Sequence, residues 1–105
     1  MSNPMKNRME ETGEEALVQA AQRGDQRAFM ELARRCQEKV YQAILGLTRS
    51  QTDADDLAQE AFMTAFRSLK DFRMKSSFTT WTYRIAINLT LNHLKRKKRK
   101  KEKWS

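Results

Sequence analysis

Apolar side chains recur every three or four residues through most of this chain, and this spacing constrains the fold more than any other feature. The pattern is clearest after residue 53, where one stripe contains Leu57, Ala61, Phe62, Ala65, Phe66 and Leu69. Such spacing places side chains on one face of an α-helix. With one proline and three glycines in 105 residues, few positions interrupt a helix. The sequence therefore predicts an all-α domain, a compact bundle of about four helices.

Capping residues mark where the first two helices begin and end. Thr12 and Glu15 are spaced as a capping box, so the first helix is expected to begin at Thr12 and to end at Gly24. Asp25 follows as the N-cap of a second helix of about 22 residues. The apolar stripe of this second helix contains Phe29, Leu32, Ala33, Cys36, Val40, Ile44 and Leu47.

Two polar breaks delimit the remaining helices. After the break at residues 48–52, Asp53 is the expected N-cap of the third helix. After the break at residues 70–77, Ser77 is the expected cap of a fourth helix that continues into the basic end of the chain. The expected buried stripe of this fourth helix contains Phe78, Trp81, Ile85 and Leu89.

Charge is distributed unevenly along the chain. The formal net charge is +8, and residues 95–103 hold eight bases and one acid, a net +7. By contrast, residues 53–60 hold four acids and no base. Surfaces of opposite sign attract different ligands, so the sequence favours two different partners.

One face of the predicted fourth helix is polar and basic. Its residues are three or four apart and form one track, which contains Arg84, Asn88, Asn92, Lys95 or Arg96, and Arg99. Cations contact phosphates and amides bond to base edges, so the track predicts binding to nucleic acid. Aromatic residues interleave with this surface at Phe72, Phe78, Trp81 and Tyr83. Core packing is the favoured role of Phe78 and Trp81, although an aromatic face at a helix start also suits stacking on an unpaired base.

The acids of residues 53–60 lie at the start of the third helix. There they offset the positive end of the helix dipole, which is a purely structural explanation. Gln59 and Glu60 lie beyond the first turn, so contact with a basic protein partner explains them at least as well. Consecutive helical positions point in different directions, so these acids are not expected to bind a metal ion.

Nothing in the sequence favours catalysis, a cofactor or a metal. His93 and Cys36 are the single histidine and cysteine, and no carboxylate is spaced to form a triad with them. One cysteine excludes an internal disulfide and a thiolate zinc site within the chain. No apolar run approaches the roughly 20 residues that cross a bilayer, and residues 1–13 lack a signal-peptide pattern. We therefore expect a cytoplasmic protein that is not an enzyme.

Three segments resemble conserved region 2 of the extracytoplasmic-function (ECF) sigma factors, which belong to the sigma-70 family. They are residues 53–62 (DADDLAQEAF), the pair Phe72-Arg73, and residues 78–88 (FTTWTYRIAIN). Gly24-Asp25 followed by Ala28-Phe29 fits the same pattern. The resemblance spans about residues 14–99, nearly all of the predicted helical chain.

The resemblance implies two partners, core RNA polymerase and the non-template strand of a bacterial promoter, and a possible anti-sigma factor. The third helix is expected to bind the clamp coiled coil of the polymerase's largest subunit. The expected polymerase-binding residues are Asp53, Asp55, Asp56, Gln59, Glu60 and Phe62. The loop at residues 72–77 and the helix after it are expected to recognise and melt the minus-ten element and to hold a flipped base. The expected DNA-binding residues are Phe72, Arg73, Lys75, Ser76, Phe78, Thr80, Trp81, Arg84, Asn88, Asn92, Lys95, Arg96 and Arg99.

The chain departs from the family pattern at three positions. Met74 and Lys75 stand where relatives often carry a small residue and an acid, and Thr82 replaces the usual leucine after the tryptophan. The expected boundaries are a flexible arm at residues 1–12, a region 2 helical domain at residues 13–97 and a basic tail at residues 98–105. The resemblance implies that this tail begins the linker to a region 4 domain, which the 105 residues do not include.

Two alternatives to the sigma-factor interpretation stay open. A basic helical adaptor could bind RNA or an acidic membrane through the tail, without sequence preference. A structural or inhibitory partner protein could use the acidic helix alone. Preference for one single-stranded DNA sequence over scrambled strands separates the sigma factor from the adaptor.

Overall fold

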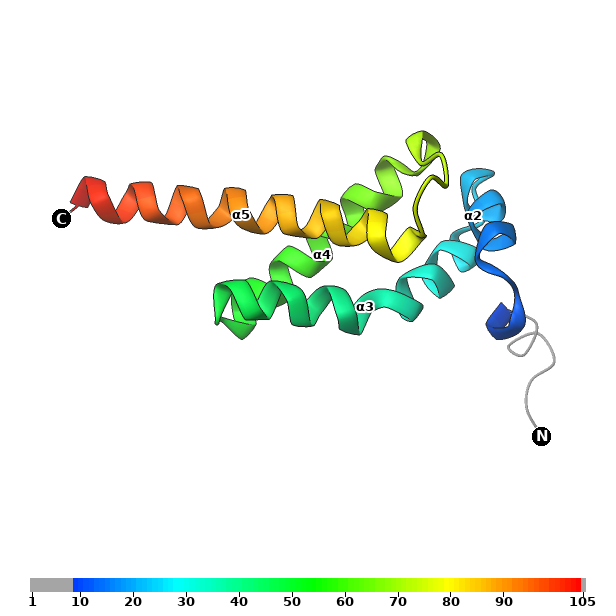
Figure 1. The fold of residues 1–105 in the computed structure, drawn as a ribbon, viewed down its shortest axis with the longest axis horizontal. Coiled ribbons are helices and arrows are strands. Elements are labelled where there is room, and N and C mark those ends of the chain that lie inside the picture. Colours follow the sequence, from blue (N-terminus) through cyan, green and yellow to red (C-terminus); the bar gives the residue numbers. More distant parts are fainter. Residues whose placement is uncertain (1–8, 105) are drawn as a thin grey trace.

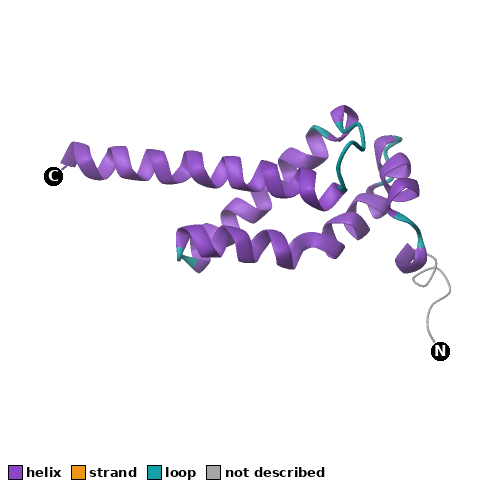
Figure 2. Ribbon diagram, in the orientation of Figure 1, coloured by secondary structure: helices purple, strands orange, loops and turns teal. Residues whose placement is uncertain are grey.

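The computed structural model describes residues 9–104, and within this range the chain forms helices, turns and loops but no β-strand. The elements are α2 (Glu14–Gln22), α3 (Gln26–Thr48), α4 (Gln51–Arg67), the 3-10 helix η1 (Leu69–Asp71) and α5 (Phe78–Trp104). Figures 1 and 2 show α3 and α5 side by side and crossed by α4, while α2 packs near the start of α3. The predicted all-α bundle of about four main helices is confirmed.

The N-terminal boundary differs from the prediction. α2 begins at Glu14 with Gly13 as its N-cap, so the predicted start of the helix at Thr12 is wrong. Residues 9–11 already form helical structure, and a bend at Thr12 separates them from α2. Part of the predicted flexible arm is therefore ordered against the domain, and the rest, residues 1–8, lies outside the described residues.

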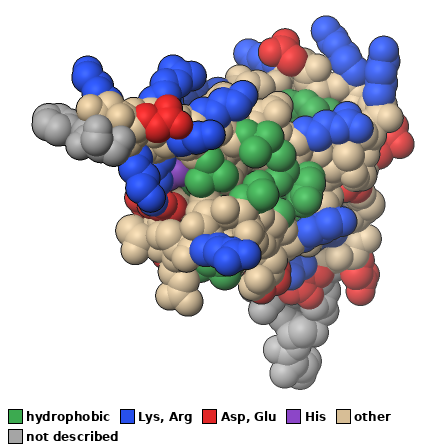
Figure 3. Space-filling view, turned by 60° about the vertical axis from the view of Figure 1, so that its left-hand side comes forward, with side chains coloured by type: hydrophobic (Ala, Val, Ile, Leu, Met, Phe, Trp, Pro, Cys, Tyr) green, Lys and Arg blue, Asp and Glu red, His purple; other side chains and the backbone are tan. Residues whose placement is uncertain are grey.

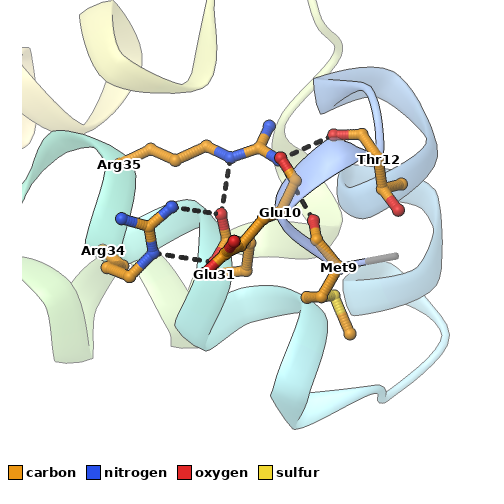
Figure 4. Close-up of polar contacts among 6 residues, drawn as sticks. All are labelled: Met9, Glu10, Thr12, Glu31, Arg34 and Arg35. Carbon is orange, nitrogen blue, oxygen red and sulfur yellow. Dashed lines mark hydrogen bonds and ion pairs between the residues drawn. The ribbon is translucent and has the colours of Figure 1, made fainter. Parts of the chain in front are cut away.

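Arg35 on α3 holds the segment at residues 9–12 in place (Figure 4). Its Nη2 donates hydrogen bonds of 2.7 to 3.2 Å to three backbone carbonyl oxygens, those of Met9, Glu10 and Thr12. Its Nε donates to the Glu31 carboxylate at 2.8 Å. A guanidinium that bonds to several carbonyls of one short segment satisfies acceptors that a short helix leaves free at its end.

Glu31 is a buried carboxylate bound by two arginines. Arg34 donates two hydrogen bonds of 2.8 Å to it, besides the one from Arg35. The hydrogen bonds from Arg34, and then those from Arg35, outweigh burial and lower the pKa of Glu31 from 4.5 to about 2. A buried charge needs such pairing, because an unpaired one would be costly.

The junction between α2 and α3 follows the sequence prediction. Gly24 has a positive φ of 103°, a conformation that glycine adopts without strain. The Asp25 side chain accepts hydrogen bonds from the backbone N–H groups of Arg27 and Ala28, at 3.0 and 3.3 Å. Asp25 is therefore the N-cap of α3, as predicted.

The junction between α3 and α4 is tighter than predicted. α3 continues to Thr48 and ends where Arg49 takes a left-handed conformation, with a φ of 55°. Ser50 then caps α4 by accepting a hydrogen bond from the Asp53 N–H at 3.2 Å. The predicted cap at Asp53 is thus wrong, because Ser50, in an extended conformation, starts the helix one turn earlier.

The core lies where α3 contacts α2, α4 and α5. On α5 the fully buried positions repeat every four residues and are Phe78, Thr82, Ala86 and Thr90. The predicted stripe was therefore displaced by one position after Phe78, since Trp81, Ile85 and Leu89 are only partly buried beside the core. Two buried threonines misled the prediction, which counted apolar residues only.

Two predicted core residues lie at the edge of the bundle. Leu47 is 42% exposed and Phe66 is 44% exposed, whereas Ala54, which was not predicted, is fully buried. The buried face of α4 is made mainly of alanines, so the helix packs closely and turns Phe66 outward. There Phe66 meets Phe29 edge to face, with ring centroids 5.1 Å apart.

Candidate protein and nucleic-acid interfaces

The acidic pole of the molecule borders a groove between α3 and α4. From α4, Asp55, Gln59 and Phe62 line the groove, which has a volume of about 700 Å³. Its other lining residues are Ala33, Gln37, Glu38, Tyr41, Ala58 and Met63. Asp56 and Glu60 are exposed one turn apart on the same helix. An apolar floor with an acidic rim suits a helical partner that presents apolar and basic side chains.

Exposed apolar side chains extend this surface beyond the groove. Met30 is 68% exposed and Met63 is 58% exposed, and Phe66 lies beside Met63. Phe29, Phe62, Met63 and Phe66 also line an adjoining hollow of about 310 Å³. Clustered exposed apolar residues are typical of protein contact surfaces, and sequence reasoning missed these because it placed Phe66 in the core.

Asp53 faces α5 instead of the groove. Its Oδ2 accepts a hydrogen bond from Lys97 Nζ at 3.2 Å and lies 3.3 Å from Nε2 of His93. The hydrogen bond from Lys97, and then the one from His93, holds the pKa of Asp53 below its ordinary value. The structure therefore places Asp53 against α5, whereas Asp55, Gln59 and Phe62 line the groove.

The predicted polar track on α5 is continuous and exposed. Its six residues are Arg84, Asn88, Asn92, Lys95, Arg96 and Arg99, and all are exposed. Within residues 9–104, no ion pair joins any of its four cations to a carboxylate. Figure 3 shows lysine and arginine side chains gathered at the projecting end of α5. Unpaired cations in a row are free to contact successive phosphates.

The loop before α5 combines exposed polar residues with buried aromatic ones. Arg73, Lys75 and Thr80 are exposed, and Ser76 is half-buried. Phe72 and Phe78, both predicted DNA-binding residues, are only 4% and 1% exposed. Their rings pack in the core, as the sequence favoured for Phe78, and can support a DNA contact only through their neighbours.

Trp81, like Tyr83, stays partly accessible in this region. It is half-buried and stacks on Phe72, with ring centroids 4.8 Å apart and planes 30° apart. Ser77 caps the helix below it, because its Oγ accepts a hydrogen bond from the Thr80 N–H at 3.0 Å. The predicted cap at Ser77 is confirmed, and it fixes Trp81 at the mouth of the loop.

Neither candidate reactive residue is placed for catalysis. Cys36 is 2% exposed, and burial raises the pKa of its thiol to about 11, which keeps it protonated near neutral pH. His93 is bound to Asp53, as described above. In the described part of the chain, no three histidine, cysteine, aspartate or glutamate side chains are grouped to hold a metal ion. No helix in the same range combines the length and apolarity that crossing a membrane requires.

The fold and its surfaces define a helical binding module with two separate faces, one acidic and apolar, the other basic and rich in amides. Residues 32–100 match the family model described as Sigma-70 region 2. The match covers more than half of the chain, so the chain belongs to the sigma-70 region 2 family.

The similar proteins are RNA polymerase sigma factors, several of which are named as ECF sigma factors. The chain is 47% identical over 81 residues to the RNA polymerase sigma-H factor of Pseudomonas aeruginosa, covering 77% of this chain and 42% of that protein. It is 44% identical over 85 residues to the ECF RNA polymerase sigma-E factor of Escherichia coli (strain K12), covering 81% and 44%. The chain thus spans less than half the length of these relatives.

A solved structure supports the same assignment. It is an NMR structure of an engineered region 2 of sigmaE in complex with GTAAAA, with a TM-score of 0.78 and 40% sequence identity. The similarity covers 87% of this chain and 95% of that one. The predicted ECF sigma factor resemblance and the region 2 fold are confirmed.

Proposed function

We propose that this chain is the domain of an ECF sigma factor that binds core RNA polymerase and recognises and melts the minus-ten element of bacterial promoters. The observation that supports this most directly is the exposed polar track on α5. The solved region 2 structure that this chain resembles, at 40% sequence identity, is a complex with GTAAAA. The function is one of binding, in the bacterial cytoplasm where promoter and polymerase meet.

The groove between α3 and α4 is the proposed polymerase contact. Asp55, Gln59 and Phe62 line it, and Asp56 and Glu60 are exposed on the same helix. A coiled coil of the polymerase clamp with basic and apolar side chains is complementary to this surface. An anti-sigma factor that covered the same groove would compete with the polymerase.

The loop at residues 72–77 and the exposed face of α5 are the proposed DNA contact. The loop would hold a base that has left the duplex, with Trp81 at its mouth, while Arg84 and Asn88 follow the unpaired strand and later residues reach the upstream duplex. Opening base pairs costs a few kcal/mol, and a pocket that accepts only unpaired bases offsets this cost. Amides supply base contacts and cations supply phosphate contacts.

The test of DNA recognition compares single strands. The chain is expected to bind an oligonucleotide containing GTAAAA, or its own preferred sequence from a randomised pool, about tenfold or more tightly than scrambled strands of equal composition. Equal affinity for every strand would support the basic adaptor instead.

The test of polymerase binding is a pull-down with core polymerase. A variant with both Asp56→Ala and Gln59→Ala should lose most of the complex, because the acidic rim is disrupted. Glu11→Gln, which removes an exposed acid away from the groove, is the matched control and should retain binding. Retention by both variants would contradict the proposed contact.

A further inference from the structure

Helix α2 is tied to both ends of the loop at residues 72–77. The side-chain amide of Gln22 donates two hydrogen bonds, to the carbonyl oxygens of Leu69 and Phe72, each 3.0 Å long. At the other end of the loop, Oε2 of Glu14 accepts a hydrogen bond from the Phe78 N–H at 3.1 Å. These contacts join residues that are 47, 50 and 64 positions apart.

Two of these contacts satisfy a backbone group that a helix end leaves free. The Phe72 carbonyl lies just after η1, where no following helical turn supplies an N–H donor, whereas the Leu69 carbonyl also accepts a hydrogen bond of 3.1 Å from the Phe72 N–H. Phe78 is the first residue of α5, and its N–H has no partner inside the helix. A carboxylate at this position also suits the positive end of the helix dipole. Gln22 and Glu14 therefore act as caps supplied by a different helix.

The loop between these two ties contains a residue in a strained backbone conformation. Met74 has a positive φ of 57°, which costs energy for a residue with a side chain. Glu14, Glu15, Arg73, Met74 and Ser76 line a hollow of about 440 Å³ between α2 and the loop. A strained loop keeps one shape only when its surroundings fix it, and here the surroundings are α2 and the stacked pair of Phe72 and Trp81.

We propose that Glu14 and Gln22 are positioning residues that preorganise the loop for the unpaired base. This inference rests on the proposed function, because it assigns these residues to the base-capture step. Neither residue needs to touch nucleic acid. Holding the loop in its bound shape beforehand removes an ordering cost that binding would otherwise have to offset. Glu14 and Gln22 therefore contribute to the selective binding of unpaired strands, and the phosphate contacts along α5 do not depend on them.

The test uses substitutions that remove these hydrogen bonds. Gln22→Met keeps a side chain of similar length but loses both donors, and Glu14→Met loses the acceptor. Glu14→Gln keeps an oxygen that accepts the Phe78 N–H and is the conservative rescue. Gln19→Met, at an exposed position of the same helix, is the matched control. Gln22→Asn keeps the amide donors but moves them back on a shorter side chain. It takes the place of Gln22→Met in the test if Gln22→Met does not fold.

Three readouts separate positioning from general stability. The first is sequence preference in a randomised pool of single-stranded oligonucleotides, and the second is affinity for one duplex at low salt. The third is the fluorescence of Trp81 in a Trp104→Phe background, because Trp81 and Trp104 are the only tryptophans. Thermal unfolding of each variant gives the folded fraction by which affinities are corrected.

The expected result is a loss of preference of about tenfold in Gln22→Met and Glu14→Met, with a shifted Trp81 emission and an unchanged duplex affinity. Glu14→Gln and Gln19→Met should behave like the parent chain. If the preference survives in both methionine variants, or falls only in step with duplex affinity, the positioning role is overturned while the proposed function stands. A parent chain without any preference among strands overturns the proposed function and the positioning role together.

Discussion

Two buried threonines on α5 differ in how their hydroxyl groups are satisfied. Thr90 Oγ1 donates a hydrogen bond of 2.8 Å to the carbonyl oxygen of Ala86. Thr82 Oγ1 is equally buried but has no hydrogen-bond partner among the described residues. The family resemblance implied leucine at the position of Thr82, and the burial of this side chain explains why an apolar residue would fit there.

Thr82→Val should stabilise the domain by about 1 kcal/mol, because it replaces an unsatisfied buried hydroxyl with a methyl group of similar size. The matched substitution Thr90→Val removes a satisfied hydroxyl and should be neutral or destabilising by up to about 1 kcal/mol. Urea unfolding of both variants and the parent measures the difference. Equal effects of the two substitutions would mean that the Thr82 hydroxyl is satisfied in solution.

At the scale of elements, the arginine pair on α3 links the N-terminal segment to the bundle. Arg34 and Arg35 both bind Glu31, but only Arg35 also bonds to the carbonyls of residues 9–12 (Figure 4). The Arg34 side chain is 57% exposed and that of Arg35 is 28% exposed. Substituting Arg34 and Arg35 separately therefore compares the contributions of two adjacent arginines to stability.

Arg35→Met should lower the free energy of unfolding by about 1 to 2 kcal/mol, because it removes charge-assisted hydrogen bonds from a partly buried site. Arg34→Met should be less destabilising, because the Arg34 side chain is the more exposed of the two. Hydrogen exchange at residues 9–12 should become faster in Arg35→Met only. Unchanged exchange there would show that Arg35 does not hold the segment.

The Glu31 carboxylate should make stability depend on pH. Its pKa of about 2 lies below the ordinary 4.5, so the ionised form is favoured by folding. This contribution is fully present above about pH 4.5 and is lost as the pH falls through about 2. Glu31→Gln should therefore be less stable than the parent by about 1 to 3 kcal/mol near neutral pH, and the gap should close in acid. A gap that stays constant with pH in urea unfolding would contradict this assignment.

At the scale of the whole molecule, the two charged surfaces lie on different helices, which pack together and are also linked by an ion-pair cluster. The acidic rim lies on α4 and the basic track on α5, and Asp53 bridges the helices through Lys97 and His93. The molecule measures 58 × 33 × 19 Å, and α5 projects from the bundle along the long direction (Figure 1). Separate surfaces would allow the two proposed partners to be bound at the same time.

Base contacts and phosphate contacts along α5 should respond differently to substitution. Asn88→Ala should reduce discrimination between minus-ten sequences, because an amide reads base edges. Lys98→Ala should weaken binding to all sequences about equally and should lower the slope of log K against log salt by about 1. Titrations of several strands over a range of salt concentrations measure both effects. Uniform losses for Asn88→Ala as well would rule out base reading by this residue.

The helices, the exposed track on α5, the separation of charge and the family could all be predicted from the amino-acid pattern alone. These properties follow from spacing within single helices, where residues three or four apart share a face whatever the tertiary structure. The prediction of which side chains are buried was less accurate. Thr82 and Thr90 are buried although they are polar, and Phe66 is half exposed although it is apolar.

Contacts between residues that are far apart in the sequence could be identified only from the three-dimensional structure. It turned Asp53 toward Lys97 and away from the groove, buried Phe72 beneath Trp81, and placed Gln22 and Glu14 at the two ends of the loop. Such contacts join residues on different helices, and their partners depend on how the helices pack and rotate against one another. Local spacing fixes which face a residue occupies, whereas packing fixes what that face touches.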